Sequence, residues 1–251
     1  MQSNPQTNPA AQQPAAPGQG PSRGGRGPNA IPAVPPEFQA DRYLKMNEAE
    51  LLQFIQDPNA TVFQKNIACR RLALIGGRSA VAPLAAMLSD EQLAHYARFA
   101  LRPNPDPAVD DALRAAIPKL KGELLVGVID TIGGRADEKA VDTLTRLMHG
   151  ADPEVAAAAA SSLGRIGGPR GARALQDALA KTNGKLRAEV GNALLLAAEG
   201  FMDKGDRKQA LALYDVLSRP DMPKHVRLGA MHSTLIAETM FTRPHETPAK
   251  P

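Results

Sequence analysis

Three arginines follow paired glycines in separate, similar stretches of the chain. Arg78 and Arg135 come directly after Gly-Gly, and Arg170 comes after Gly-Gly-Pro. A guanidinium donates bidentate hydrogen bonds to carboxylates and phosphates, so equivalent turns could hold an acidic partner along one edge. The competing explanation is local, because a cation near a helix C-terminus is favoured by about 0.3–1 kcal/mol. Both interpretations stay open at this stage.

A fourth candidate, Arg102, begins the proline-rich segment Arg102–Pro107. This segment replaces a Gly-Gly turn, so we expect it either to tilt the neighbouring helices or to mark a partner contact. The predicted partner-binding residues are therefore Arg78, Arg135, Arg170 and Arg102. A second group lies inside predicted helices and is expected to line one face of the array or to extend between units: Arg71, Arg98 and Arg165.

Residue types that support catalysis or metal binding do not occur at productive spacings. The five histidines form no His-Glu-x-x-His or His-x-x-His motif, and no zinc pattern with the single cysteine, Cys69. We predict no catalytic residues, no metal site, no cofactor, and a protein that is not an enzyme. Cys69 lies in an apolar helical stretch and is expected to be a buried thiol.

Capping residues predict where the helices begin. Asn47 precedes Glu50 by three residues in a capping-box arrangement, and another helix is expected to start by about Thr61. Asp152-Pro153 combines an N-cap aspartate with a proline at the first helical position. Apolar residues recur between these signals at spacings of three and four, which is typical of amphipathic helices.

One phrase recurs, in which an apolar helical stretch ends in Gly-Gly and a second apolar stretch follows. Its copies end at Gly77, Gly134 and Gly168. Because glycine enters the left-handed conformation without a Cβ penalty, we expect these glycines to end helices and let the chain reverse. Repeated hairpins of this kind predict an all-α fold, a right-handed α-solenoid of about five to six stacked antiparallel helix pairs.

The pattern Ala-x-x-x-Leu-Gly-x-Ile-Gly, followed by Ala-Val-x-x-Leu, resembles HEAT repeats of the short bacterial kind, also called phycobilisome-lyase-like HEAT repeats. The resemblance covers residues 48–198, and the Ile-Gly-Gly phrases are its most specific part. It implies a multi-helix α-solenoid. Such repeats also occur in exported multidomain proteins, so the resemblance alone implies neither a location nor a task.

The sequence divides into three parts. Residues 1–44 are rich in proline, glutamine and glycine and are expected to be a disordered tail. Residues 45–240 are expected to be the HEAT-like solenoid, of which 186–240 drift toward a tetratricopeptide-like hairpin and a capping helix. Residues 241–251 are expected to be a flexible end.

Composition narrows the classes of function. Acidic and basic residues nearly balance, at 26 and 30, and tryptophan is absent, so a nucleic-acid groove is not expected. No run reaches the roughly 18 apolar residues of a membrane helix, and the polar start is not a signal peptide. As written the chain is expected in the cytoplasm. A signal peptide missing from this start would make it exported or periplasmic.

These features favour a non-enzymatic scaffold or adaptor that binds another protein along an α-solenoid surface. The alternative is an accessory or regulatory module of an enzyme, either a bilin lyase-like subunit or part of an exported multidomain catalytic protein. Nucleic-acid binding is a third interpretation, and it would need basic and aromatic residues concentrated on one surface.

Overall fold

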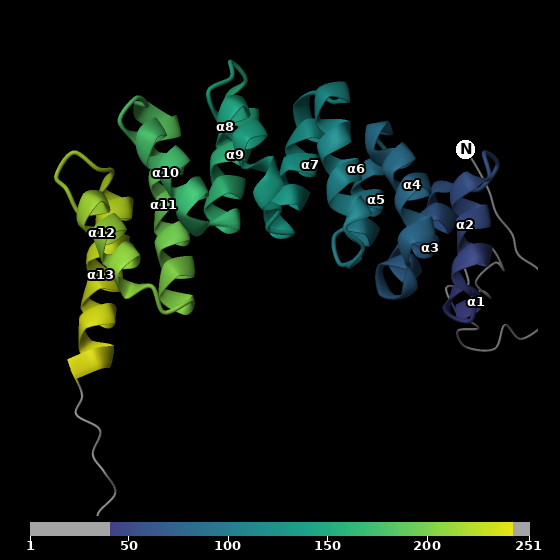
Figure 1. Ribbon diagram of the computed structural model, residues 1–251. Coiled ribbons are helices and arrows are strands. Elements are labelled where there is room, and N and C mark those ends of the chain that lie inside the picture. The colour runs from purple at the N-terminus through teal and green to yellow at the C-terminus, as the bar shows by residue number, and fades with distance from the viewer. Residues whose placement is uncertain (1–40, 243–251) are drawn as a thin grey trace, which may run out of the picture. The chain divides into compact units, whose positions relative to one another are not determined.

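The computed structural model describes residues 41–242, and these residues form thirteen α-helices, three short 3-10 turns and no strand (Figure 1). The predicted all-α solenoid is confirmed. The helices are α1 (Asp41–Leu44), α2 (Glu48–Gln56), α3 (Val62–Ile75), α4 (Arg78–Ala86), α5 (Ala94–Leu101), α6 (Ala108–Ala116), α7 (Gly122–Gly134), α8 (Val141–Met148), α9 (Pro153–Ile166), α10 (Gly168–Leu179), α11 (Gly184–Asp203), α12 (Arg207–Leu217) and α13 (Lys224–Thr242).

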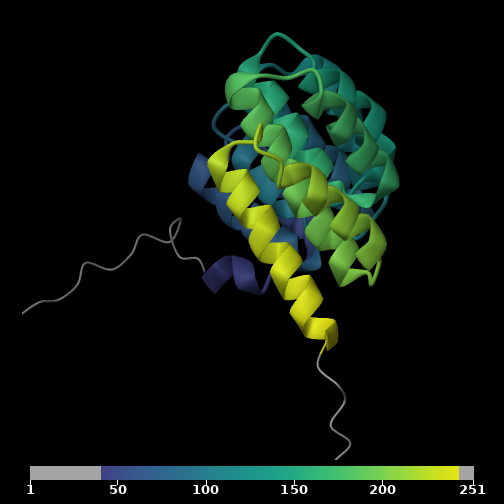
Figure 2. The ribbon, with the colours of Figure 1, turned by 90° about the vertical axis from the view of Figure 1, so that its left-hand side faces the viewer.

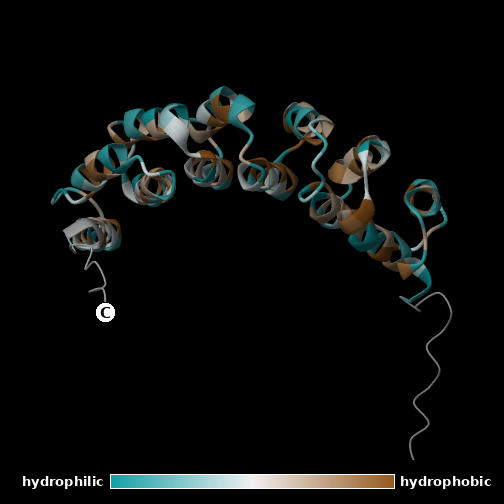
Figure 3. Cartoon of the chain, turned by 60° about the horizontal axis from the view of Figure 1, so that its bottom comes forward, coloured by the Kyte–Doolittle hydropathy of each residue, from teal (hydrophilic) through white to brown (hydrophobic). Residues whose placement is uncertain are grey.

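The helices from α2 to α13 alternate between two rows (Figure 3). The inner row, on the inside of the bend of this unit, contains α3, α5, α7, α9, α11 and α13, and each of these helices packs against the next. The outer row contains α2, α4, α6, α8, α10 and α12, each packed against the inner helix that follows it. The described residues thus form six helix pairs, within the predicted five to six.

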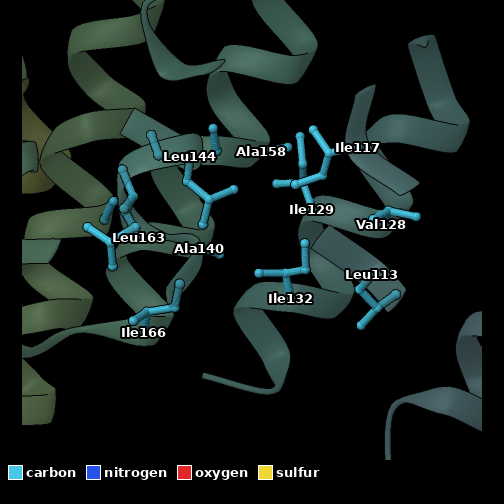
Figure 4. Packing of buried hydrophobic residues seen from close by; sticks show 14 of the residues in the cluster. Leu113, Ile117, Val128, Ile129, Ile132, Ala140, Leu144, Ala158, Leu163 and Ile166 are labelled. Carbon is cyan, nitrogen blue, oxygen red and sulfur yellow. The ribbon is translucent and has the colours of Figure 1, made fainter. Parts of the chain in front are cut away.

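A continuous apolar core lies between the two rows. Figure 4 shows the part formed by α6 to α9, where Leu113, Ile129, Leu144 and Leu163 have no exposed surface. Each such side chain contributes about 1.5–3 kcal/mol when it is removed from water. Burial between rows, more than the helix propensity of single segments, therefore holds the stack together.

The predicted helix starts are confirmed. At the start of α2, the Glu50 N–H donates to Asn47 Oδ1 at 3.0 Å, and the Asn47 N–H donates to Glu50 Oε2 at 2.8 Å. Thr61 and Gln64 form the same reciprocal pair at the start of α3. Asp152 accepts hydrogen bonds from two backbone N–H groups in the first turn of α9.

The paired glycines do not share one conformation, so the prediction that all of them end helices in the left-handed region is wrong. Only Gly167 and Gly168, with φ of 61° and 67°, lie in that region. At the first turn, Gly76 and Gly77 both have negative φ. At the second, both glycines still belong to α7, and the left-handed residue is Ala136, with φ of 55°.

Gly133, a paired glycine, and Gly164, which precedes the third pair, allow inner helices to approach closely. A Cβ at Gly133 of α7 would lie 2.6 Å from the Cβ of Ser162 in α9. A Cβ at Gly164 of α9 would lie 2.5 Å from the carbonyl oxygen of Ala193 in α11. The absence of a side chain at these positions thus sets the spacing within the inner row.

The folded part begins earlier than predicted. Residues 41–44, assigned above to the tail, form α1, where Tyr43 is fully buried and its ring centroid lies 5.4 Å from that of Phe54. Burial of the tyrosine ring offsets the entropy cost of ordering this short segment. The rest of the predicted tail, residues 1–40, and the end from 243 to 251 lie outside the described residues.

The predicted C-terminal hairpin and last helix are present. Gly205, with φ of 79°, lies in the turn between α11 and α12, and Asp206 caps α12 by accepting from the Gln209 N–H. Figure 2 looks onto α12 and α13 at this end of the unit. On α13, four large apolar side chains are exposed: Leu228, Met231, Leu235 and Ile236. The likeness to a tetratricopeptide repeat stays a prediction.

Candidate functional site

Arg78 and Arg170 lie at the starts of outer helices, in the first turns of α4 and α10. The helix dipole does not favour cations at a helix N-terminus, so the dipoles of α4 and α10 themselves do not explain these arginines. Each faces an aspartate of a neighbouring helix pair: Arg78 Nη1 is 3.6 Å from Asp106 Oδ1, and Arg170 Nη2 is 2.8 Å from Asp142 Oδ1. Both arginine side chains remain more than half exposed, so their binding to a partner stays a prediction.

Arg135 is used inside the fold. Its side chain is 10% exposed, and its Nε donates to Asp110 Oδ1 at 2.5 Å. Its Nη1 donates to the carbonyl oxygens of Leu101, Arg102 and Asn104 at distances of 2.6 to 3.2 Å. The expectation that Arg135 presents its guanidinium to a partner is therefore wrong, because these donors already bind the end of α5. The three glycine-following arginines do not form one common edge.

The proline-rich segment 102–107 connects neighbouring helix pairs. Asn104 is buried, and its Nδ2 donates to the carbonyl oxygens of Gly76 and Gly77 at 3.2 and 2.9 Å. Asp106 accepts from the Ala108 N–H at the start of α6. Because Arg135 binds the other side of the segment, the middle of this turn is held within the stack.

A hollow of about 780 Å³ lies on the inner row, across α3, α5, α7 and α9. On its wall, Leu74 and Phe99 leave 76% and 50% of their surfaces exposed. Three arginines also line it: Arg98, Arg102 and Arg165. Exposed large apolar side chains that gather in a concave surface beside fixed charges are typical of a binding site.

Two glycines of α7 make room for Arg98 of α5 and for Arg102, which follows the end of α5. A Cβ at Gly127 would lie 2.3 Å from Arg98 Cζ, and a Cβ at Gly134 would lie 2.8 Å from Arg102 Nη2. The two guanidinium groups therefore lie against the bare backbone of α7. Neither guanidinium donates a hydrogen bond to, or forms an ion pair with, any residue that the structure describes. Both groups are thus positioned against α7 without a direct contact to a carboxylate.

The other charged groups around the hollow have partners. Arg165 Nη2 donates to Asp130 Oδ1 at 2.6 Å and to Ser162 Oγ at 3.0 Å. On α3, Arg70 Cζ lies 5.9 Å from the ring centroid of Phe99, within the range of a cation–π contact. With three lining arginines against one aspartate, the hollow carries a net positive charge.

Burial lowers the pKa of Arg98, and the negative charge of Asp130 acts in the opposite direction. Arginine nevertheless stays protonated near neutral pH, because its unperturbed pKa is above about 12. A half-buried cation with unused donors interacts more strongly with a carboxylate than a fully solvated one does. The chemistry that the hollow offers is therefore recognition of an acidic group next to an apolar one.

The Thr131 hydroxyl and the Cys69 thiol, which could act as nucleophiles, are held within helices. The Thr131 hydroxyl donates to the Gly127 carbonyl oxygen at 2.8 Å, within α7. Burial raises the pKa of the Cys69 thiol to about 12, and the prediction that Cys69 is buried is confirmed.

Over residues 41–242, no three His, Cys, Asp or Glu residues are grouped as metal ligands. No helix in that range has the length and apolar character needed to span a bilayer.

Helix pairs stacked in two rows, with ion pairs and hydrogen bonds between neighbouring pairs, define an α-solenoid. Within it, residues 106–195 match the family model for HEAT repeats, a segment that runs from the start of α6 into α11. Residues 106–195 thus form HEAT repeats, in agreement with the sequence pattern. A comparison with curated proteins finds no significant match. The short bacterial, lyase-like subtype stays a prediction.

Sequence reasoning found only part of this site. Arg98 and Arg165 line the hollow and also reach α7 of the neighbouring pair, so both alternatives expected for them apply, whereas Arg71 does not line the hollow. The apolar residues of the wall and the glycines behind the arginines were missed. One available signal was Gly127, which interrupts an apolar helix seven residues before Gly134 and lies on the same side of it.

Proposed function

We propose that this chain is a non-enzymatic scaffold or adaptor that binds another protein through the inner row of its solenoid. HEAT repeats commonly mediate protein–protein interaction, and residues 106–195 match this family. The observation that carries the proposal is the exposure of Phe99 and Leu74 in a hollow lined by arginine. Buried aromatic and arginine side chains supply much of the affinity at protein interfaces.

The charges along the inner row support a protein partner over a nucleic acid. Asp130 lines the hollow, and Glu199 and Asp203 are exposed farther along, on α11. A phosphate backbone that followed the inner row would meet these carboxylates and be repelled. The wall of this hollow carries two aromatic rings, the phenyl ring of Phe99 and the imidazole of His95. The successive bases of a nucleic-acid strand would therefore lack further rings on which to stack.

Affinity capture with the full chain as bait tests this proposal. Phe99→Ser and Leu74→Ser each remove an exposed apolar side chain from the hollow. Val62→Ser is the matched control, because Val62 is 40% exposed and lies at the other end of α3. Partners should be lost with the first two variants and retained with the control, at unchanged midpoints of urea unfolding. Equal capture by all baits would refute binding through the inner row.

A further inference from the structure

We infer that the hollow binds an acidic and apolar segment of the partner protein, in which a carboxylate pairs with Arg98 and Arg102 while a neighbouring apolar side chain packs on Phe99. This inference rests on the proposed function and adds the chemistry of the bound segment. The acidic component comes from the unpaired guanidinium groups, and the apolar component comes from the exposed wall.

The charge argument depends on which arginines are already paired. Arg165 binds Asp130, and its charge is therefore largely balanced within the stack. Arg98 and Arg102 have no hydrogen-bond or ion-pair partner among the described side chains. They lie four residues apart, Arg98 in α5 and Arg102 at its C-cap, about 6 Å along the helix axis. One or two carboxylates of a short segment can reach both.

The glycines of α7 position this pair. Gly127 admits the half-buried Arg98 guanidinium against the helix backbone, so Arg98 has less freedom than an ordinary exposed arginine, whereas Arg102, beside Gly134, remains exposed. A group that is already ordered loses less rotamer entropy when a ligand binds. The same positions thus fix where a carboxylate must approach.

The apolar wall limits the size and type of the segment. Phe99 lies between the two arginines in sequence, and Arg70 contacts its ring from α3. Leu74 extends the exposed apolar surface toward α3. A hollow of about 780 Å³ fits a few side chains of a peptide and not a folded domain. An acidic residue next to leucine, isoleucine or phenylalanine satisfies both requirements.

A peptide selection tests the inference without knowledge of the natural partner. A phage library of random twelve-residue peptides is first passed over the Arg98→Gln/Arg102→Gln variant to remove phages that bind it. The remaining phages are then selected on the unmutated full chain. The recovered peptides should be enriched in Asp and Glu beside large apolar residues. The strongest of them, labelled with fluorescein, should bind the double variant about tenfold or more weakly. Exchange of its acidic residues for glutamine or asparagine should weaken binding to a similar degree.

Two single variants sharpen the test. Gly127→Ala displaces Arg98 without changing the charge, so it should weaken binding of the labelled peptide several-fold. Arg173→Gln removes an exposed arginine from α10 in the outer row and should leave the affinity unchanged.

Several results would overturn the inference. They are the absence of any enriched peptide, enrichment of basic or uncharged peptides, and equal affinity for the double variant. Displacement of the peptide by a single-stranded DNA 20-mer of equal affinity would show a general polyanion site and would also overturn it. If the selection fails while Phe99→Ser still abolishes partner capture, the proposed function stands and only the acidic chemistry is wrong. If Phe99→Ser leaves capture unchanged, the proposed function itself fails.

Discussion

The guanidinium of Arg98 occupies the space next to α7 that a side chain at Gly127 would fill, since a Cβ there would lie 2.3 Å from Arg98 Cζ. Gly127→Ala therefore moves only the end of a flexible side chain. We expect the free energy of unfolding to change by less than about 1 kcal/mol, because the better helix propensity of alanine offsets the displacement. Urea titration measures this change. A loss above about 2 kcal/mol would contradict the idea that Arg98 can move aside.

Gly164 should respond differently, because it meets backbone and not the end of a side chain. A Cβ at Gly164 would lie 2.5 Å from the Ala193 carbonyl oxygen, so Gly164→Ala forces α9 and α11 apart. We expect a loss of about 1–3 kcal/mol in unfolding free energy. Gly200→Ala on α11 is the control, since no atom lies within 4 Å of its Cβ. Equal stability of the two variants would be evidence against close packing at Gly164.

Removal of the Arg135 side chain should destabilise the stack strongly. Arg135→Ala deprives three carbonyl oxygens and Asp110 of a donor at once. We expect a loss of about 2–4 kcal/mol. Arg170→Ala is the matched comparison, because its pair with Asp142 is exposed and contributes about 0–1 kcal/mol. Denaturant unfolding of both variants checks the difference, and similar losses would argue against the internal role of Arg135.

Glu48 should give the fold a pH-dependent contribution. Its Oε1 accepts from the Ser79 hydroxyl at 2.6 Å and from the Gly77 N–H at 2.9 Å, and these bonds hold its pKa below the usual 4.5. Because the folded state favours the ionised form, this stability is present above about pH 4.5 and is lost as the pH falls through the lowered pKa. Glu48→Gln should cost about 1 kcal/mol at about pH 7. The difference should shrink toward about pH 3, and a pH-independent difference would contradict this account.

The Cys69 thiol should be unreactive until the chain unfolds. Its pKa of about 12 leaves almost no thiolate near about pH 8, and its side chain is fully buried in α3. Modification by iodoacetamide should be slow in buffer and should accelerate in urea along the unfolding transition. Rapid modification of the native protein would show that α3 opens locally.

The sequence was sufficient to predict helix type, helix starts and the repeated stack, because these depend on local signals. Asn47, Thr61 and Asp152 act through atoms within three residues of themselves. Contacts between units were not predictable in this way. Nothing adjacent to Arg135 in sequence reveals that its donors reach the end of α5, and nothing near Gly127 reveals the arginine that lies against it. Such pairings depend on how one helix pair is placed on the next.

The hollow crosses four consecutive inner helices, from α3 to α9, and no single repeat contains it. Its width therefore follows the curvature of the stack. A segment bound at Leu74, Phe99 and Arg165 together would resist straightening of these repeats, because extension would separate groups that the ligand holds. By thermodynamic linkage, tension that straightens the solenoid would weaken binding of that segment. Binding in the hollow and a pulling force on the chain would thus be coupled.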